Sequence, residues 1–200
     1  MADLFKDLLT REGFEVILST SLDSFADAGL LESLSVIVPN WTMGKISSEQ
    51  LNPLLAAVEE GLGVAGCHGG MCDAFRDSPE WQFMTGGQWV AHPGNDRVSY
   101  SVKIKDREHP IMAGLNDFSL TSEQYYMHVD PAIRVLATTH FPTAPGPHLP
   151  NGSLAMPVVW TKLYGKGKVF YCSLGHTPQI LADDPVATMM RRGFHWSARA

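Results

Sequence analysis

A glycine-rich turn carries the first residues that could do chemistry. The residues Gly66-Cys67-His68-Gly69-Gly70 follow a short run of small and apolar residues, Gly63–Cys67. A strand-to-helix turn of this kind exposes a side chain above the end of the strand, where helix amide groups lower the pKa of a thiol. His68 is therefore a candidate acid–base residue and Cys67 a candidate nucleophile. A small buried cysteine is the favoured interpretation of Cys67, and a structural histidine is an equal alternative for His68.

A second histidine, His176, follows another apolar run, Lys168–Ser173. Ligands of open α/β sheets bind beyond the carboxyl ends of the strands, so we expect His68 and His176 to reach one cleft. Glu123 and Tyr125 lie two residues apart in a predicted strand, which puts both side chains on one face. A strand that faces solvent explains this pair equally well. We expect His68, Glu123 and His176 to supply the acid–base groups of the site.

Further residues could line a site for a hydroxyl-rich ligand. Asp73 and Arg76 stand three apart at a helix start, where an ordinary ion pair is the simpler interpretation. In the functional interpretation, Arg76 binds the ligand while Asp73 orients His68. Trp89 and His92 lie an odd number of residues apart, so both reach one site only if their strand ends early. The expected substrate-binding residues are Cys67, Asp73, Arg76, Trp89, His92 and Tyr125.

The sequence predicts no metal site and no cofactor. Its eight histidines include no pair at i,i+4 and no H-x-H pattern. A site that combines histidines and carboxylates from distant segments is a minor alternative. The three cysteines, Cys67, Cys72 and Cys172, lack CxxC spacing and are interpreted as reduced thiols.

Composition argues against two classes of partner. The net charge is −6 and the 15 Lys and Arg are scattered, so no basic stripe is present to bind nucleic acid. No apolar run approaches the roughly 20 residues that cross a bilayer. The start, MADLFKDLLTREGF, lacks the pattern of a signal or transit sequence. We expect a cytoplasmic protein that binds a small molecule, and a homo-oligomer is compatible with the sequence.

The order of elements indicates a single α/β domain over residues 1–200. A helix is expected at Ala2–Glu12, and another begins at a capping box of Ser47 and Gln50. Apolar runs at Phe14–Ser19 and Ser35–Pro39 predict strands of a doubly wound, mostly parallel sheet. A last helix is expected from Asp183 or Asp184. Further strands are predicted in the second half, at Gln88–His92, Val98–Ile104, Glu123–Val129, Val135–Thr139, Pro157–Leu163 and Lys168–Ser173. The last two of these are expected to form a hairpin.

Several motifs occur in a characteristic order between Gly61 and Pro178. A G-x-x-G-x-H-G-G turn at 63–70 precedes a D-A-F-R helix start at 73–76 and a G-G-x-W-x-x-H-P element at 86–93. Shorter motifs follow, namely His109-Pro110-Ile111, Gly114-Leu115, Asp117-Phe118, Glu123–Tyr126, Pro157–Trp160, Tyr164–Gly167 and Leu174–Thr177. This ordered set resembles the ThuA-like (trehalose-utilisation) family of the class I glutamine amidotransferase-like superfamily.

The resemblance implies a flavodoxin-like fold and a link to the breakdown of trehalose and related glycosides. Amidotransferases of the superfamily keep a catalytic thiol at the place of Cys67. Their partner pattern, His followed two residues later by Glu, is absent, because this chain reads His176-Thr177-Pro178. The family pattern also places a strand before the first helix, whereas this chain begins inside that helix. We therefore expect the sheet to lack its central opening strand, or another segment to fill that place.

Three functions stay open at this point. The leading one is an enzyme of carbohydrate catabolism that acts on a disaccharide or a keto-glycoside. The second is a non-catalytic sugar-binding or regulatory module that uses the same cleft. The third is a Cys67-dependent hydrolase related to the amidotransferases, for which glutaminase activity is disfavoured by the missing partner carboxylate.

Overall fold

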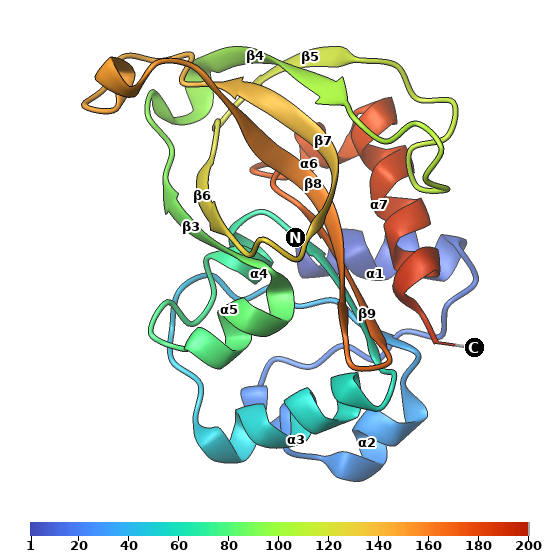
Figure 1. The fold of residues 1–200 in the computed structure, drawn as a ribbon. Coiled ribbons are helices and arrows are strands. Elements are labelled where there is room, and N and C mark those ends of the chain that lie inside the picture. The colour runs from blue at the N-terminus through green and yellow to red at the C-terminus, as the bar shows by residue number, and fades with distance from the viewer. Residues whose placement is uncertain (200) are drawn as a thin grey trace.

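A mixed sheet of seven strands forms the centre of the molecule in the computed structural model, which describes residues 1–199 (Figure 1). The strand order is β1-β2-β9-β8-β7-β4-β5. Three neighbouring strands are parallel, namely β1 (Val36–Ile37), β2 (Gly63–Cys67) and β9 (Gly167–Cys172). The others pair antiparallel and are β8 (Leu154–Tyr164), β7 (Arg134–Phe141), β4 (Val98–Ile104) and β5 (Phe118–Ser122).

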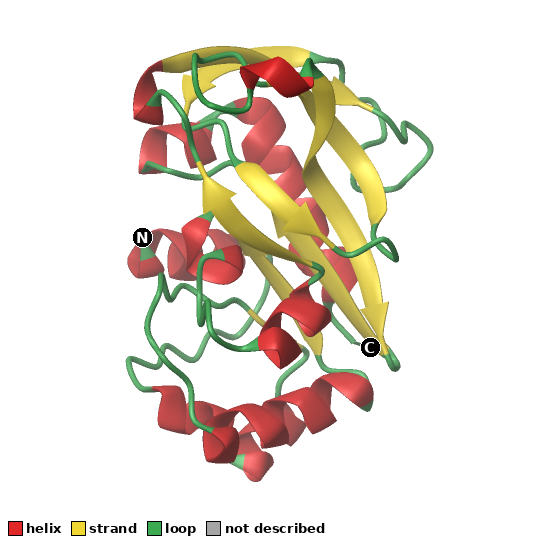
Figure 2. Ribbon diagram, turned by 60° about the vertical axis from the view of Figure 1, so that its left-hand side comes forward, coloured by secondary structure: helices red, strands yellow, loops and turns green. Residues whose placement is uncertain are grey.

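Helices cover both faces of this sheet, and a small second sheet lies beside it (Figure 2). The second sheet pairs β3 (Gly87–Ala91) with β6 (Tyr126–Val129). The helices are α1 (Ala2–Arg11), α2 (Ala28–Ser33), α3 (Ser48–Glu59), α4 (Gly69–Cys72), α5 (Pro79–Thr85), α6 (Pro178–Ala182) and α7 (Asp184–Ser197). No helix among the described residues is both long and apolar enough to span a membrane.

Local sequence rules explain several of these boundaries. The capping box at the start of α3 is confirmed, because Ser47 accepts from the Gln50 amide while the Gln50 side chain accepts from the Ser47 amide. The helix predicted from Asp183 or Asp184 is α7, with Pro185 in its first turn. The predicted hairpin is the β8–β9 pair, in which Tyr164 faces Gly167.

The prediction of a mostly parallel sheet is wrong, although the α/β class is correct. Strands β8 and β9 connect through a short turn, which can only join antiparallel neighbours, and the antiparallel strands β7, β4 and β5 extend the same main sheet. The predicted strand at Phe14–Ser19 is also wrong. Within the described residues, nothing makes a backbone hydrogen bond to Val16, Ile17 or Leu18. A cavity of about 390 Å³ is lined by this segment, α1 and β1.

Both faces of the parallel strands are buried, as their continuous apolar runs predict. Along β9, Val169 and Tyr171 join one hydrophobic cluster while Phe170 and Cys172 join the other. One cluster includes side chains of α1 and α7, and the other includes side chains of α3 and α5. The carboxyl ends of β2 and β9 are therefore held rigidly from two sides.

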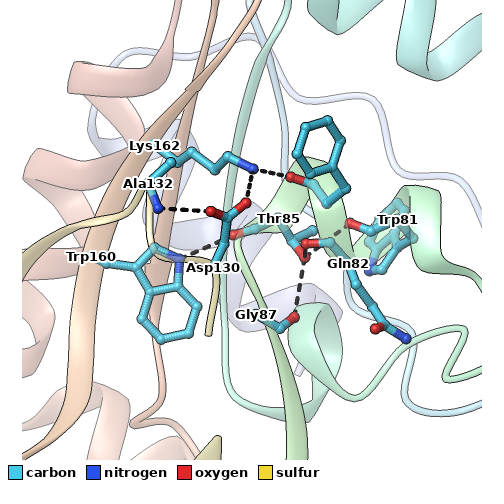
Figure 3. Close-up of polar contacts among 9 residues, drawn as sticks. Trp81, Gln82, Thr85, Gly87, Asp130, Ala132, Trp160 and Lys162 are labelled. Atoms are coloured by element: carbon cyan, nitrogen blue, oxygen red, sulfur yellow. Dashed lines mark hydrogen bonds and ion pairs between the residues drawn. The ribbon is translucent and has the colours of Figure 1, made fainter. Parts of the chain in front are cut away.

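A buried ion pair fixes the turn that leads from α5 into the second sheet (Figure 3). Lys162 Nζ of β8 lies 2.6 Å from Asp130 Oδ2, and only 5% of the lysine side chain is exposed. The same ammonium group donates to the Phe83 carbonyl, and Trp160 donates its indole N–H to the Thr85 carbonyl at 3.0 Å. These bonds hold the start of β3, which carries the expected site residue Trp89 and is followed directly by His92.

Candidate functional site

His68, directly after β2, adopts a strained backbone conformation. Its φ of 50° and ψ of −149° are rare for a residue with a side chain and cost about 1–3 kcal/mol. Surrounding bonds hold it there: the His68 amide donates to the Cys172 carbonyl at 2.8 Å, and the Tyr171 hydroxyl donates to the His68 carbonyl at 3.1 Å. The turn thus presents the imidazole, rather than the neighbouring thiol, at the carboxyl end of the sheet.

Cys67 lies in the hydrophobic core beneath this turn and is only 5% exposed. A Cβ atom added to Gly175 would lie 2.8 Å from its sulfur, so the two residues are tightly packed. Burial, together with the nearby Cys172, raises the pKa of the Cys67 thiol well above its ordinary value. The thiol is therefore protonated at neutral pH, as expected for the favoured interpretation of a small buried cysteine.

The carboxylate of Glu123 lies at the centre of three histidines. Its Oε2 atom is 3.0 Å from His68 Nε2 and 3.4 Å from His176 Nδ1, and its Oε1 atom is 3.9 Å from His92 Nε2. The ring centroids of His68 and His176 are 5.4 Å apart. The structure thus brings together the three residues that sequence reasoning expected to supply acid–base groups.

Glu123 reaches this position from the connection between β5 and β6, and not from a strand as predicted. The Tyr100 hydroxyl donates to the Glu123 backbone carbonyl at 2.8 Å. The next residue, Gln124, is buried. Its side-chain amide donates to the Thr139 hydroxyl and the His140 carbonyl at the end of β7, and accepts from the Thr143 amide just after it. Sequence reasoning missed Gln124 and Tyr100, although a glutamine between two predicted site residues was a visible clue.

Tyr125 fixes the other side of the His68 ring. Its hydroxyl lies 2.9 Å from His68 Nδ1, and the two ring centroids are 4.4 Å apart. Trp89 and His92 are also here, with ring centroids 6.2 and 6.1 Å from that of Tyr125. Strand β3 shifts register after Trp89 and ends at Ala91, which meets the condition for both side chains to reach one site.

Asp73 and Arg76 form the wall of the site next to Trp89. Arg76 Nη2 donates to Asp73 Oδ2 at 3.0 Å, and the guanidinium carbon lies 4.5 Å from the Trp89 ring centroid. Asp73 is buried whereas the Arg76 side chain is 45% exposed. The simpler interpretation of Asp73 and Arg76 as an ion pair is therefore confirmed. The alternative in which Asp73 orients His68 is wrong, because the Asp73 carboxylate binds Arg76 and Tyr125 holds the imidazole.

Burial and the neighbouring charges set the ionisation of the central pair. Burial lowers the pKa of His68 below its ordinary value, and the Glu123 carboxylate offsets this only in part. Burial raises the pKa of Glu123, but the contact with His68 and the charges of the histidines lower it by more than burial raises it. The pKa of Glu123 therefore lies below its ordinary value. Near neutral pH the site therefore combines an ionised carboxylate with a neutral His68 imidazole, which can donate or accept a proton.

Solvent reaches this cluster from the side of His92, His176 and Arg76, whose side chains are partly exposed. The 390 Å³ cavity between α1 and β1 is a different feature, since none of the predicted site residues lines it. A ligand of the cluster would therefore approach across the open edge formed by the ends of β2 and β9 and the start of the second sheet.

Comparisons with known proteins agree with the arrangement of the chain. A putative ThuA-like protein from Parabacteroides merdae superposes with a TM-score of 0.74 at 21% identity, covering 98% of this chain and 83% of that one. A second putative ThuA-like protein, from Bacteroides uniformis, superposes with a TM-score of 0.75 at 18% identity, covering 98% of this chain and 81% of that one. A cytoplasmic protein from Salmonella typhimurium superposes with a TM-score of 0.74 at 16% identity, covering 99% of this chain and 87% of that one. At these identities the likeness establishes the fold alone.

No protein of curated function matches the sequence. The model of the ThuA family, described as trehalose utilisation, matches residues 1–197. The match covers nearly the whole chain, including the Gly-rich turn of His68 and the loop of His176. The chain therefore belongs to the ThuA family.

Proposed function

We propose that the protein acts in carbohydrate catabolism, on trehalose or a related disaccharide or keto-glycoside. Membership of a family described by trehalose utilisation supports the substrate class. The observation that carries the proposal is the convergence of His68, Glu123 and His176 at one solvent-accessible point. An ionised carboxylate between two imidazoles supplies a base and proton donors within reach of one ligand.

The chemistry around this point suits a sugar. Sugars present apolar ring faces and many hydroxyls, so their sites combine aromatic rings with groups that donate and accept hydrogen bonds. Trp89 supplies an aromatic face, with Arg76 covering one side of its ring, and the buried Tyr125 ring packs beside it. The exposed part of the Arg76 guanidinium donates to hydroxyl or carbonyl oxygens, while Glu123 accepts from hydroxyls.

The alternative is a sugar-binding or regulatory module without catalysis, and the same residues would then only hold the ligand. A Cys67-dependent hydrolase is disfavoured, because the thiol is buried, protonated at neutral pH and covered by Gly175. The two remaining functions differ in one measurable respect, which is turnover.

The test compares Glu123→Gln with Glu12→Gln, since Glu12 also contacts a histidine, His195, at 3.1 Å but lies outside the site. Calorimetry with trehalose, other disaccharides and their keto derivatives measures binding, and sugar analysis by chromatography measures turnover. We expect Glu123→Gln to lose at least about 100-fold in turnover, the usual effect of an acid–base group, with Glu12→Gln unchanged.

Binding without turnover by the wild-type protein would favour the non-catalytic module. Failure of the wild-type protein to bind any of these sugars at about 10 mM, well above the usual range of KM values, would reject the proposal.

A further inference from the structure

We propose that His68, Glu123 and His176 bind a divalent first-row transition metal ion, with zinc as the best fit. One ligand atom from each residue, either a ring nitrogen or a carboxylate oxygen, lies within 4.8 Å of the other two. The three residues come from the β2–α4 turn, the β5–β6 connection and the loop after β9. No local sequence spacing therefore reveals the site, which explains why a search for i,i+4 or H-x-H patterns predicts no metal.

The distances match those of a tetrahedral centre. Zinc binds nitrogen and oxygen at about 2.0–2.1 Å, so neighbouring ligand atoms of a tetrahedral site lie roughly 3.3–3.4 Å apart. Glu123 Oε2 is 3.0 Å from His68 Nε2 and 3.4 Å from His176 Nδ1. A cation between these three atoms would need only small side-chain movements.

The hydrogen bonding of His68 supports the same interpretation. Nε2 is buried and is not matched to a hydrogen-bond partner, although Glu123 Oε2 lies 3.0 Å away. On the other side of the ring, Nδ1 lies 2.9 Å from the Tyr125 hydroxyl. If Nδ1 carries the hydrogen and donates it to Tyr125, the lone pair of Nε2 faces Glu123 and His176. This is the tautomer that a metal requires, with an outer partner that fixes the ring.

The ligand set determines which ion fits. Two imidazoles and one carboxylate suit zinc and the other first-row ions, whereas magnesium and calcium prefer oxygen ligands alone. Three protein ligands leave a position for water or a substrate oxygen, and the 34% exposure of the His176 side chain gives solvent access to it. His92 lies 3.9 Å from the second carboxylate oxygen, outside the trio.

This inference deepens the proposed function, since a bound metal would polarise a sugar oxygen or water at the same point. The catalytic role of the metal rests on the proposed function. Metal binding itself is measured without any sugar, so either proposal can fail alone.

The experiment uses the full chain, stripped with a chelator and dialysed, then titrated with Zn²⁺ by calorimetry and reloaded for elemental analysis. The variants are His68→Ala, Glu123→Gln and His176→Ala. His195→Ala is the control, because it removes a histidine that pairs with a glutamate 3.1 Å away at the surface. Circular dichroism and unfolding midpoints check that each variant folds.

We expect one Zn²⁺ per chain in the wild-type protein and in His195→Ala. Each site variant should weaken binding by more than about 100-fold, the upper range for the loss of an outer partner. Co²⁺ should give the intense visible bands of a tetrahedral site in the wild-type protein and lose them in His176→Ala. Less than one equivalent bound by the wild-type protein, or equal weakening in His195→Ala, would overturn the proposal.

Discussion

The Tyr125 hydroxyl lies 2.9 Å from Nδ1 of His68, while the other ring nitrogen of His68 faces the Glu123 carboxylate 3.0 Å away. One imidazole thus connects a buried phenol to the centre of the candidate site. Burial raises the pKa of Tyr125 well above its ordinary value, so the phenol keeps its proton at physiological pH. Tyr125 is therefore a positioning residue that fixes the ring and tautomer of His68.

Replacing Tyr125 by Phe tests this role. The ring volume is kept while the hydrogen bond is lost, so we expect zinc affinity to fall by about 10–100-fold, as for other outer partners of metal-binding histidines. Calorimetry with Zn²⁺ measures the change. Tyr126→Phe is the matched control, since the Tyr126 ring packs against Phe141 away from this bond. Equal affinities of Tyr125→Phe and the wild-type protein would contradict the assigned role.

Much of the site was predictable because its residues follow strands. His68 comes directly after β2 and His176 lies in the loop that follows β9, and parallel strands that pair side by side end at the same edge. The hydrogen bonds within the site were only partly predictable from sequence. The three-residue spacing favoured an ion pair between Asp73 and Arg76, which is confirmed, whereas the contact of Tyr125 with His68 joins distant segments and had no local signal.

The fold shows a similar division between local and non-local information. Capping, hairpin and apolar patterns correctly placed α3, the β8–β9 hairpin and α7, because these depend on neighbouring residues. The apolar segment Phe14–Ser19 has the composition of a strand but no strand pairs with it among the described residues. Pairing partners depend on distant segments, so composition alone over-predicted this strand and missed β5.

The thiol of Cys67 should be unreactive in the folded protein. Its pKa is raised by burial, and a protonated thiol is a poor nucleophile. We expect none of the three buried cysteines to react with a thiol reagent at pH 7.5 within minutes, and all three to react in denaturant. Cys67→Ala should bind and turn over any identified sugar as the wild-type protein does. Rapid labelling of Cys67 in the native state, with loss of turnover, would instead support the hydrolase.

The Lys162–Asp130 pair should be important for stability. Lys162→Met leaves the Asp130 carboxylate without its cation, and breaking a buried pair in this way costs about 3–5 kcal/mol. Urea unfolding followed by fluorescence measures the loss. The double variant Lys162→Met/Asp130→Asn removes both charges and should recover part of it. A single variant as stable as the wild-type protein would show that the pair contributes little.

The same pair predicts a pH dependence. The hydrogen bond from Lys162 lowers the pKa of Asp130 below its ordinary value of 3.8. A carboxyl group whose pKa is lowered in the folded state contributes stability above its unfolded pKa and loses it as pH falls through the folded pKa. The free energy of unfolding should therefore fall below about pH 4. Asp130→Asn should show a shallower fall than the wild-type protein, and identical slopes would count against this contribution.

The strained backbone of His68 predicts an unusual effect of glycine. At a φ of 50° a side chain is unfavourable and glycine is not, so His68→Gly should be about 1 kcal/mol more stable than His68→Ala. His176 is the matched control, because it is not among the described residues with positive φ. There, His176→Ala should be at least as stable as His176→Gly. Urea unfolding of the four variants measures both differences. If alanine and glycine rank in the same order at the two positions, the turn is not strained at His68, and the backbone there is not what holds the imidazole against Glu123.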